Sequence, residues 1–503
     1  MRENNRKPIE KCIKKLPQFT TMNVIDGQAG LVIYSSLIFY SLTIDNILNI
    51  IVLLILAGVS IAMLTGENGI LNKATTAKQK TEQGTAEERV KLEVGGSFGE
   101  DGKLDTDLLN ENLRKNIDGL TYNGKAITEK GVAEENRIDS LPATVELDGY
   151  EIIINENGSA STIIRMAEYQ TEDTKPYLPG NDFSQVSGTT LDNGLVVTDG
   201  TNYWTWIEVP KTKVFASDTT EDNLDKIEDD LEAYTGALLS RNGYTDQWYD
   251  GQGKTESETT NPNDTSGCGL TAQQYKDLKE TMLSSVYKNG GFWIGQYEAG
   301  ADTYPATANN DTRTPVIAQG KYPYNYITCA NAQIKSSQLN SGNYTSSLMF
   351  GIQWNLVLKH LQVRGKMTAD DLTNDSTNWG NYSNATFEIE DVNAKYTTSP
   401  YTANSFKSYT EDTSGYVEEN TKLNKGVLLT TGANGRRNSK MNIYDIAGNE
   451  YEWTLEKSTR ANIPCTVRGG YYTAFGSNIP ASDRFYDSAT YSNKNISFRP
   501  ALY

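Results

Sequence analysis

The stretch NIYDIAGNEYEW, residues 442–453, is the most informative part of the chain. The motif VRGG follows it at 467–470, and SFR lies close to the C-terminus at 497–499. These motifs belong to a longer region, residues 186–503, whose residue patterns alternate between strand-like and helix-like spacing. Strand-like patterns occur at 204–209 and 291–298, and helical spacing occurs at 222–240, 271–288 and 353–361. The region is therefore predicted to be an α+β domain, with 365–440 mainly a polar surface loop.

The three motifs resemble the formylglycine-generating-enzyme-like family, also called the sulfatase-modifying-factor family, which has a C-type lectin-type fold. Further segments are similar to that family, in the family's order: WTWIEVPKTKVF at 204–215, FWIGQYEAG at 292–300, YPYNYITCANAQI at 322–334, SLMFGIQWNLVLKHL at 347–361 and NWGNY at 378–382. The resemblance implies an irregular core with few regular elements, in which Trp354 and Trp453 are buried.

The chemistry of that family depends on cysteine. Its oxidase activity needs a pair of cysteines in the C-terminal segment, which bind copper as thiolates. The chain has four Cys, and none follows Cys465. We therefore expect no oxidase activity, while a disulfide among Cys268, Cys329 and Cys465 stays open. A hydrolase or other enzyme on the same fold is the alternative, since two carboxylates are enough for a glycosidase; the lone His360 is expected to be structural.

The composition favours a binding surface over a nucleic-acid partner. Lys and Arg number 46 and Asp and Glu 64, which gives a formal net charge of −18. Nucleic acid is excluded as a partner, because binding it requires a basic surface. Tyr is common, at 30 residues against 12 Phe, and Tyr-rich surfaces with Ser, Gly and Asn are typical of binding sites.

The N-terminal region predicts a membrane anchor. Residues 1–30 form a basic leader, and residues 31–65 form a membrane segment whose core span, 47–64, is an uncharged run of 18 residues. About 20 apolar residues cross a bilayer. The positive-inside rule places the leader in the cytoplasm and everything after the span outside the cell. Three further parts are predicted before the C-terminal domain: a polar helix at 66–95, a small β-containing spacer at 96–165 with hairpin turns at Asp148-Gly149 and Asn157-Gly158, and a linker at 166–185.

A second resemblance covers residues 53–82, LLILAGVSIAMLTGENGILNKATTAKQKTE. This stretch is similar to the N-terminal segment of pilin-like surface proteins of Gram-positive anaerobes, which carry a prepilin-type signal. Gly30 is the candidate processing site, but Ser35 stands where pilins that assemble usually have Glu. A pilin-like structural subunit is therefore the second alternative function.

The segment between RGG and SFR is the candidate binding site. Non-catalytic proteins of this fold include the variable proteins of diversity-generating retroelements, in which mutation of asparagine codons at adenines excludes Trp, Met, Gln, Glu and Lys. In residues 471–495 only Lys494 falls outside the permitted set; an ordinary Ser/Tyr/Asn-rich loop is the alternative. We expect an external protein or glycan to bind here, while Arg468, Arg484 and Arg499 brace the loop. The expected ligand-binding residues are Tyr471, Tyr472, Phe475, Phe485, Tyr486 and Tyr491.

Calcium is the one metal that the sequence leaves open. Zinc sites made of several Cys or His are excluded by count. The resemblance implies calcium near Asn449 and Glu452, whose oxygens suit that ion. The alternative is that Asn449 supports a turn and Glu452 pairs locally.

Overall fold

The computed structural model describes most of the chain beyond residue 69. The described residues are 70–99, 101–236, 241–248, 263–304, 312–341, 344–388, 393–398, 405–408, 417–418, 422–424, 426–433, 439–460 and 462–503. The predicted leader, 1–30, and membrane segment, 31–65, lie outside them. Within the part that is described, no helix is both long enough and apolar enough to span a bilayer.

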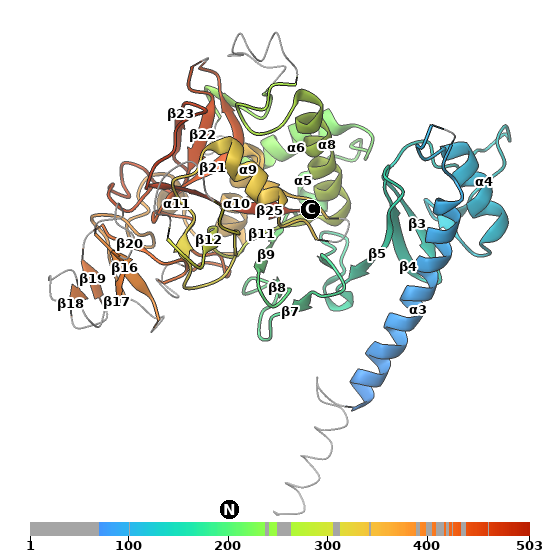
Figure 1. Cartoon of the computed structure of the whole chain (residues 1–503), viewed down its shortest axis with the longest axis horizontal. Helices are drawn as coiled ribbons and strands as arrows, with labels where there is room; N and C mark the ends of the chain where they lie inside the picture. Colours follow the sequence, from blue (N-terminus) through green and yellow to red (C-terminus); the bar gives the residue numbers. More distant parts are fainter. Residues whose placement is uncertain are drawn as a thin grey trace, which may run out of the picture. The chain divides into compact units, whose positions relative to one another are not determined.

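The chain divides into two compact units, Met1–Thr85 and Ala86–Tyr503. The second unit contains two separate hydrophobic clusters, one built from residues 86–160 and the other from residues 166–503. Its mixture of helices and antiparallel sheets confirms the α+β class (Figure 1).

The smaller cluster lies between helices and an antiparallel sheet. Helix α3 (Ile70–Gly95) contributes Ala86, Val90 and Val94, which are buried at helical spacing. The predicted turn at Asp148-Gly149 is confirmed, because both residues have positive φ and β3 pairs with β4 across them. The other elements are α4 (Thr106–Asn116), β1 (Thr121–Tyr122), β2 (Lys125–Ala126), β3 (Ala143–Leu147), β4 (Tyr150–Ile154), β5 (Ala160–Arg165) and β6 (Tyr177–Leu178), with sheet order β2-β1-β3-β4-β5-β6.

The predicted linker, 166–185, is packed into the second cluster. Tyr177 is 0% exposed and lies edge-on to Trp206 and Trp293, with ring centroids 5.7 and 6.3 Å away. This segment also carries a 3₁₀ helix, Ala167–Tyr169, and strands β6 and β7 (Ser184–Gln185). It therefore forms part of the folded structure.

Two larger sheets organise the C-terminal region. The first has the order β14-β25-β11-β9-β8-β7, and the second has the order β10-β21-β22-β23, with β24 parallel to β21. Their strands are β8 (Val196–Thr198), β9 (Tyr203–Glu208), β10 (Tyr244–Thr245), β11 (Gly291–Gly295), β14 (Ser346–Leu348), β21 (Tyr451–Ser458), β22 (Cys465–Arg468), β23 (Arg484–Asp487), β24 (Ile496–Phe498) and β25 (Pro500–Leu502).

The helices follow their sequence signals closely. Helix α8 (Ala272–Asn289) has the predicted capping box of Thr271 and Gln274 and ends at Gly290 in the left-handed conformation. Trp354 and Trp453 are 0% exposed, which confirms their core role. The remaining helices are α5 (Lys211–Val214), α6 (Leu224–Thr235), α9 (Cys329–Ser337), α10 (Gly351–Val363) and α11 (Ala369–Thr373).

The expectation of a mainly surface loop at 365–440 is wrong for much of its described part. Trp379, Tyr382 and Tyr396 are buried there, because these scattered aromatic residues pack into the main core. The short strands of this region and its surroundings are β12 (Gly300–Ala301), β13 (Tyr322–Pro323), β15 (Thr386–Glu388), β16 (Lys395–Thr397), β17 (Lys407–Ser408), β18 (Val417–Glu418), β19 (Lys422–Asn424) and β20 (Leu428–Leu429).

Candidate ligand-binding surface

The sheet of β10, β21, β22 and β23 places the candidate site at its edge. Trp453 of β21 pairs with Val467 of β22, which pairs with Phe485 of β23. Residues paired across neighbouring antiparallel strands point to the same side of the sheet. Trp453 and Val467 are fully buried, whereas Phe485 on the edge strand is 48% exposed. The row therefore begins in the core and ends at the surface.

The Asn, Asp and Gly residues of the motif at 442–453 lie where the backbone turns. Asn442, Asp445, Gly448 and Asn449 have φ angles of 56°, 55°, 74° and 58°. Glycine adopts this left-handed region freely, and Asn and Asp tolerate it better than other residues do. The turns lie directly before β21, and Thr205 of β9 in the first large sheet donates to the carbonyl of Asn442 at 2.8 Å.

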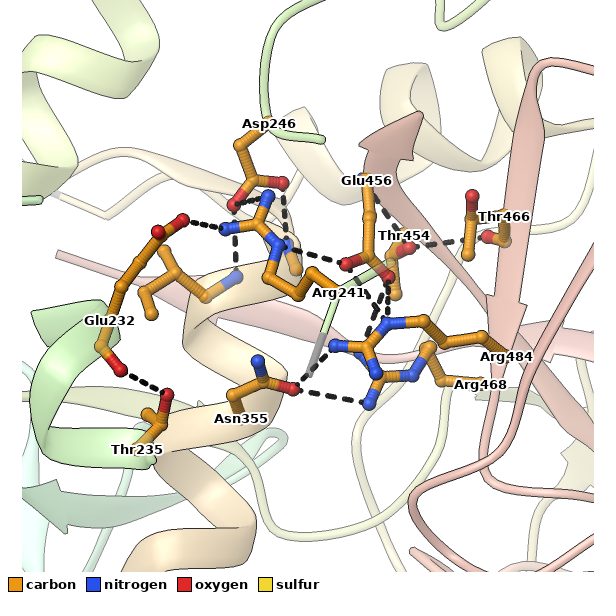
Figure 2. A network of polar contacts seen from close by, with 12 residues as sticks. Glu232, Thr235, Arg241, Asp246, Asn355, Thr454, Glu456, Thr466, Arg468 and Arg484 are labelled. Carbon is orange, nitrogen blue, oxygen red and sulfur yellow. Dashed lines mark hydrogen bonds and ion pairs between the residues drawn. The ribbon is translucent and has the colours of Figure 1, made fainter. Parts of the chain in front are cut away.

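A buried network of charges lies within this sheet and joins it to helix α10 (Figure 2). Glu456 is 0% exposed and forms ion pairs with Arg241 at 3.2 Å, Arg468 at 3.3 Å and Arg484 at 3.0 Å. Asn355 of α10 accepts hydrogen bonds from Arg468 and Arg484 at 3.2 and 2.8 Å. Burial alone raises the pKa of Glu456, but the three arginines outweigh it and hold that pKa below its usual value. Glu456 is therefore an anion at neutral pH.

Asp246 extends the network to the N-terminus of α10. Its carboxylate accepts hydrogen bonds from the backbone N–H groups of Gly351 and Ile352 at 2.8 and 2.9 Å. It also pairs with Arg241 at 3.0 Å. A carboxylate at a helix N-terminus satisfies free N–H groups and complements the helix dipole.

The expected bracing of the loop between RGG and SFR is confirmed for Arg468. Arg468 donates to the backbone carbonyls of Ser482 and Asp483 at 3.3 and 3.0 Å. Arg499 does not bind this loop; it donates to the carbonyls of Gly295 and Tyr444, at 2.9 and 2.7 Å, which lie outside it. Arg484 acts differently, since it binds Glu456 and Asn355 rather than the loop backbone.

The loop between β22 and β23 is held mainly through its own backbone. The carbonyl of Gly476 accepts from the N–H of Ser376 at 3.1 Å, and the carbonyl of Ala481 accepts from Trp354 Nε1 at 3.1 Å. The N–H of Ser482 donates to the carbonyl of Leu372 at 3.0 Å. Such bonds do not depend on which side chains the loop carries.

Five of the six predicted binding residues lie wholly or partly at the surface. Phe475 is 53% and Phe485 48% exposed, and Tyr471, Tyr486 and Tyr491 are half-buried. Phe485 stacks on Tyr486, with ring centroids 5.1 Å apart and an angle of 8° between the planes. We call Tyr471, Phe475, Phe485, Tyr486 and Tyr491 the aromatic surface. Ring contacts link three of them, Tyr471, Phe485 and Tyr486, in part through Tyr451.

The prediction that Tyr472 belongs to the ligand-binding face is wrong. Its side chain is only 2% exposed, so it belongs to the interior and not to a binding face. Gly469 and Gly470 precede it with φ angles of 93° and 80°, and such turns break the simple alternation of inward and outward side chains. The backbone N–H of Tyr472 donates to the carbonyl of Asn449 at 3.0 Å, which fixes the position.

Tyr451 is a residue that sequence reasoning missed. It is 6% exposed, and its ring centroid lies 5.1 Å from that of Tyr471 and 6.3 Å from that of Phe485. Its hydroxyl donates to Asp483 at 2.7 Å. Tyr451 therefore packs against Tyr471 and Phe485 from the buried side of the aromatic surface. Its place directly inside the motif at 442–453 was the available signal.

The oxygens of Asn449 and Glu452, which were expected to hold calcium, have hydrogen-bond partners within the protein. Both carboxylate oxygens of Glu452 are bound by Arg499, at 3.0 and 2.6 Å. The Oδ1 atom of Asn449 accepts from Asn381 at 2.8 Å and from the N–H of Leu429 at 3.1 Å. A calcium ion at this position would therefore have to share or displace these hydrogen bonds. Among the residues described, no group of three or more His, Cys, Asp or Glu side chains is arranged to hold a metal ion.

Three further buried carboxyl groups lie near this motif. Glu298 and Glu450 are 0% exposed and Asp445 is 2% exposed. Burial raises the pKa of each, to about 6 for Asp445 and well above the ordinary value for Glu298 and Glu450. Glu298 accepts a hydrogen bond from Asn449, and Glu450 accepts one from Asn325 at 2.7 Å. Sequence reasoning missed them because acidic residues are usually exposed.

An acidic pocket of about 580 Å³ lies between α6 and the segment around β10. Residues of α6 and of the segment 241–247 line it. Glu228 at its wall is paired with Lys279 at 2.6 Å, and burial raises the pKa of Glu228. The acidic residues that line the pocket are Asp225, Glu228, Asp229, Glu232 and Asp246.

His360 has the structural role expected of it. It is 4% exposed, and its Nδ1 atom accepts a hydrogen bond from the backbone N–H of Glu208 at 3.2 Å. Burial, together with the nearby Arg364, lowers the pKa of His360 to about 4. The imidazole is therefore neutral at physiological pH and closed off from solvent.

Comparisons of the chain with family models, with curated proteins and with solved structures gave no match.

Proposed function

We propose that the chain is a membrane-anchored cell-surface protein that binds an external protein or glycan through the aromatic surface of a non-catalytic C-type lectin-type domain. The observation that carries the proposal is the exposure of Phe475 and Phe485, 53% and 48%, on a loop and strand that are otherwise tightly fixed. Large aromatic side chains that are exposed on a rigid scaffold are the usual anchors of an interface.

The architecture of the loop supports recognition without loss of stability. Ser376, Trp354, Leu372 and Arg468 all bind backbone atoms of the loop. Exposed side chains on such a loop can change while these bonds persist. The same property supports diversification of residues 471–495 by a retroelement, with the buried Tyr472 as an exception. An adjacent reverse transcriptase gene and a near-repeat of the 3′ coding sequence would support diversification, and the absence of both would contradict it.

The anchoring part of the proposal rests on the sequence. The uncharged run at 47–64 is long enough to cross a bilayer, and the basic leader before it orients the chain with its N-terminus inside. The C-terminal domain is then extracellular, where an aromatic surface can meet a partner.

The cysteines support a role other than the oxidation carried out by the resembling family. The resembling family oxidises its substrate with a C-terminal thiol pair, and this chain has no cysteine after Cys465. Cys465 itself is fully buried. The domain therefore lacks the groups for that reaction.

Site-specific photocrosslinking tests the proposal for a ligand of any chemistry. A benzoylphenylalanine placed at Phe475 or Phe485 of the full chain, on intact cells in their natural surroundings, should yield the same crosslinked adduct. Ile334 is the matched control, since it is 49% exposed on α9 and lies outside the aromatic surface. Adducts of equal yield at Ile334, or none at either Phe position, would refute the proposed surface.

A variant with Phe475→Ala, Phe485→Ala and Tyr491→Ala gives the complementary test. It should fail to compete for the partner found by crosslinking. Each aromatic anchor typically contributes about 2 kcal/mol or more to binding. Retained competition by a folded triple variant would place the binding site elsewhere.

A further inference from the structure

Cys329 and Cys465 come from distant parts of the sequence and meet in the core. Cys329 is the first residue of α9, and Cys465 is the first residue of β22. Both are 0% exposed, and each thiol lies in the electrostatic surroundings of the other. The Sγ atom of Cys329 also lies 3.6 Å from the carbonyl oxygen of Thr454, which pairs with Thr466, the neighbour of Cys465.

We propose that Cys329 and Cys465 form a disulfide bond when the domain folds in a compartment that contains a disulfide oxidant. Both cysteines are reduced in the structure, as is Cys268. Cys268 is the competing partner, because the thiol of Cys465 also lies 3.6 Å from the carbonyl oxygen of Gly267. The contact of the Cys329 thiol with Thr454, whose strand partner is the neighbour of Cys465, favours the Cys329–Cys465 pair. The inference concerns the scaffold and does not depend on the proposed ligand-binding role.

The chemistry is thiol–disulfide exchange with a small disulfide, such as oxidised glutathione, or with an oxidised dithiol protein. One thiol loses its proton, and its thiolate attacks the oxidant to form a mixed disulfide and release one oxidant thiol. The second thiolate then attacks the sulfur of the first and releases the other oxidant thiol. The two cysteines lose two protons and two electrons, and the oxidant gains both.

The bond must form before the core closes. The neighbouring Cys465 thiol and burial together raise the pKa of the Cys329 thiol well above its ordinary value. Since the thiolate is the attacking species, the native reduced pair is unreactive. Access for an oxidant therefore exists during folding, and the same burial protects the finished bond from reductants.

The bond would fix the strand next to the aromatic surface. It would join the start of α9 to β22, and β22 pairs with β23, which carries Phe485. Residues 329 and 465 enclose a long loop, and long loops give the larger entropic stabilisation when they are closed. A crosslink here would thus hold the sheet that presents Phe485.

The test is refolding of the full chain in two buffers. The reduced, denatured protein is refolded with a mixture of reduced and oxidised glutathione, or with reduced glutathione alone. It is then denatured again in N-ethylmaleimide, digested and analysed by mass spectrometry. We expect most of the chain from the oxidising buffer to contain the Cys329–Cys465 link, with Cys12 and Cys268 alkylated. The reducing buffer should give four alkylated cysteines.

Thermal stability and three variants complete the test. The oxidised protein should melt about 5 °C or more above the reduced one, and added dithiothreitol should reverse this after unfolding. Cys329→Ala or Cys465→Ala should remove the difference, while Cys268→Ala should keep it. The inference is overturned if Cys329 and Cys465 are alkylated after oxidative refolding, or if either links to Cys268 or Cys12 instead. The comparison of the parent in two buffers needs no substitution, so a variant that fails to fold leaves the test intact.

Discussion

Glu456 is the point at which the C-terminal sheet is most sensitive to a single substitution. Its carboxylate is fully buried and is shared by Arg241, Arg468 and Arg484 (Figure 2). Glu456→Gln preserves the shape of the side chain but leaves three buried or nearly buried guanidinium groups without their common anion. Removal of one partner from a buried ion pair costs about 3–5 kcal/mol.

That cost sets the size of the expected change in melting temperature. With about 2.1 cal/mol/K of unfolding entropy per residue, a domain of roughly 300 residues shifts by about 1.6 °C for each kcal/mol. We therefore expect Glu456→Gln to lower the melting temperature by about 5–8 °C. The unfolding of the full chain in detergent is measured by tryptophan fluorescence. Glu232→Gln is the matched control, because Glu232 also pairs with Arg241 but its side chain is 50% exposed. An exposed pair contributes about 1 kcal/mol or less, so the control should shift by about 1 °C.

The pH dependence provides an independent check. The pKa of Glu456 is held below its ordinary value of 4.5, so its stabilisation is complete above that value and is lost only as the pH falls through the lower, folded pKa. The difference between parent and Glu456→Gln should therefore be the same at pH 8 and pH 6. The double variant Glu456→Gln with Arg484→Gln should be more stable than the sum of the two single losses predicts, because Arg484→Gln removes one of the cations that Glu456→Gln leaves unpaired. A Glu456→Gln protein that melts within 1 °C of the parent would refute the reasoning.

Four further outcomes are expected. The pKa of His360 is lowered from its ordinary value of 6.5 to about 4 in the folded state, so the unfolded chain binds this proton first and the unfolding free energy falls as the pH drops below 6.5. His360→Gln should reduce this loss of unfolding free energy between pH 6.5 and 5 by about 2 kcal/mol, as measured by denaturant titrations. Tyr472→Ala should lower the unfolding free energy by about 3–5 kcal/mol, since the side chain is buried, whereas Phe485→Ala should cost about 1 kcal/mol or less; equal losses would contradict the assignment of inner and outer residues. Millimolar calcium should leave the melting temperature unchanged, because Arg499 and Asn381 already occupy the oxygens of Glu452 and Asn449; a clear rise would show that the ion displaces these bonds. Protease added to intact cells should remove the C-terminal domain and spare a cytoplasmic control protein, and protection of both would reject the proposed topology.

Local signals in the sequence predicted local structure well. Asp148-Gly149 makes the hairpin turn between β3 and β4, and Thr271 with Gln274 caps α8, because in both cases the interacting atoms lie within a few residues of each other. The charge network could not be predicted in this way. Arg241, Asn355, Glu456 and Arg484 come from four distant segments, and nothing in the sequence around any one of them indicates which partner neutralises it.

Five of the six residues predicted for the candidate site are wholly or partly exposed, and the sixth, Tyr472, is buried. The error at Tyr472 has a specific cause, since the left-handed turns at Gly469 and Gly470 reset the direction in which the following residues point. Tyr472 and Tyr471 are adjacent and identical in type, so composition could not separate the inner residue from the outer one. Only the path of the backbone distinguishes them.

The loop of the candidate site is held by hydrogen bonds to its backbone, while its exposed side chains take little part in holding it. A binding loop must keep one conformation, or its partner must supply the free energy to order it. In this chain the order comes from bonds to the carbonyls of Gly476, Ala481, Ser482 and Asp483, and from charges that are buried within the sheet. The exposed rings of Phe475 and Phe485 contribute little to that order. Under the proposed function, the residues that hold the fold and the residues that would face a partner are therefore different ones.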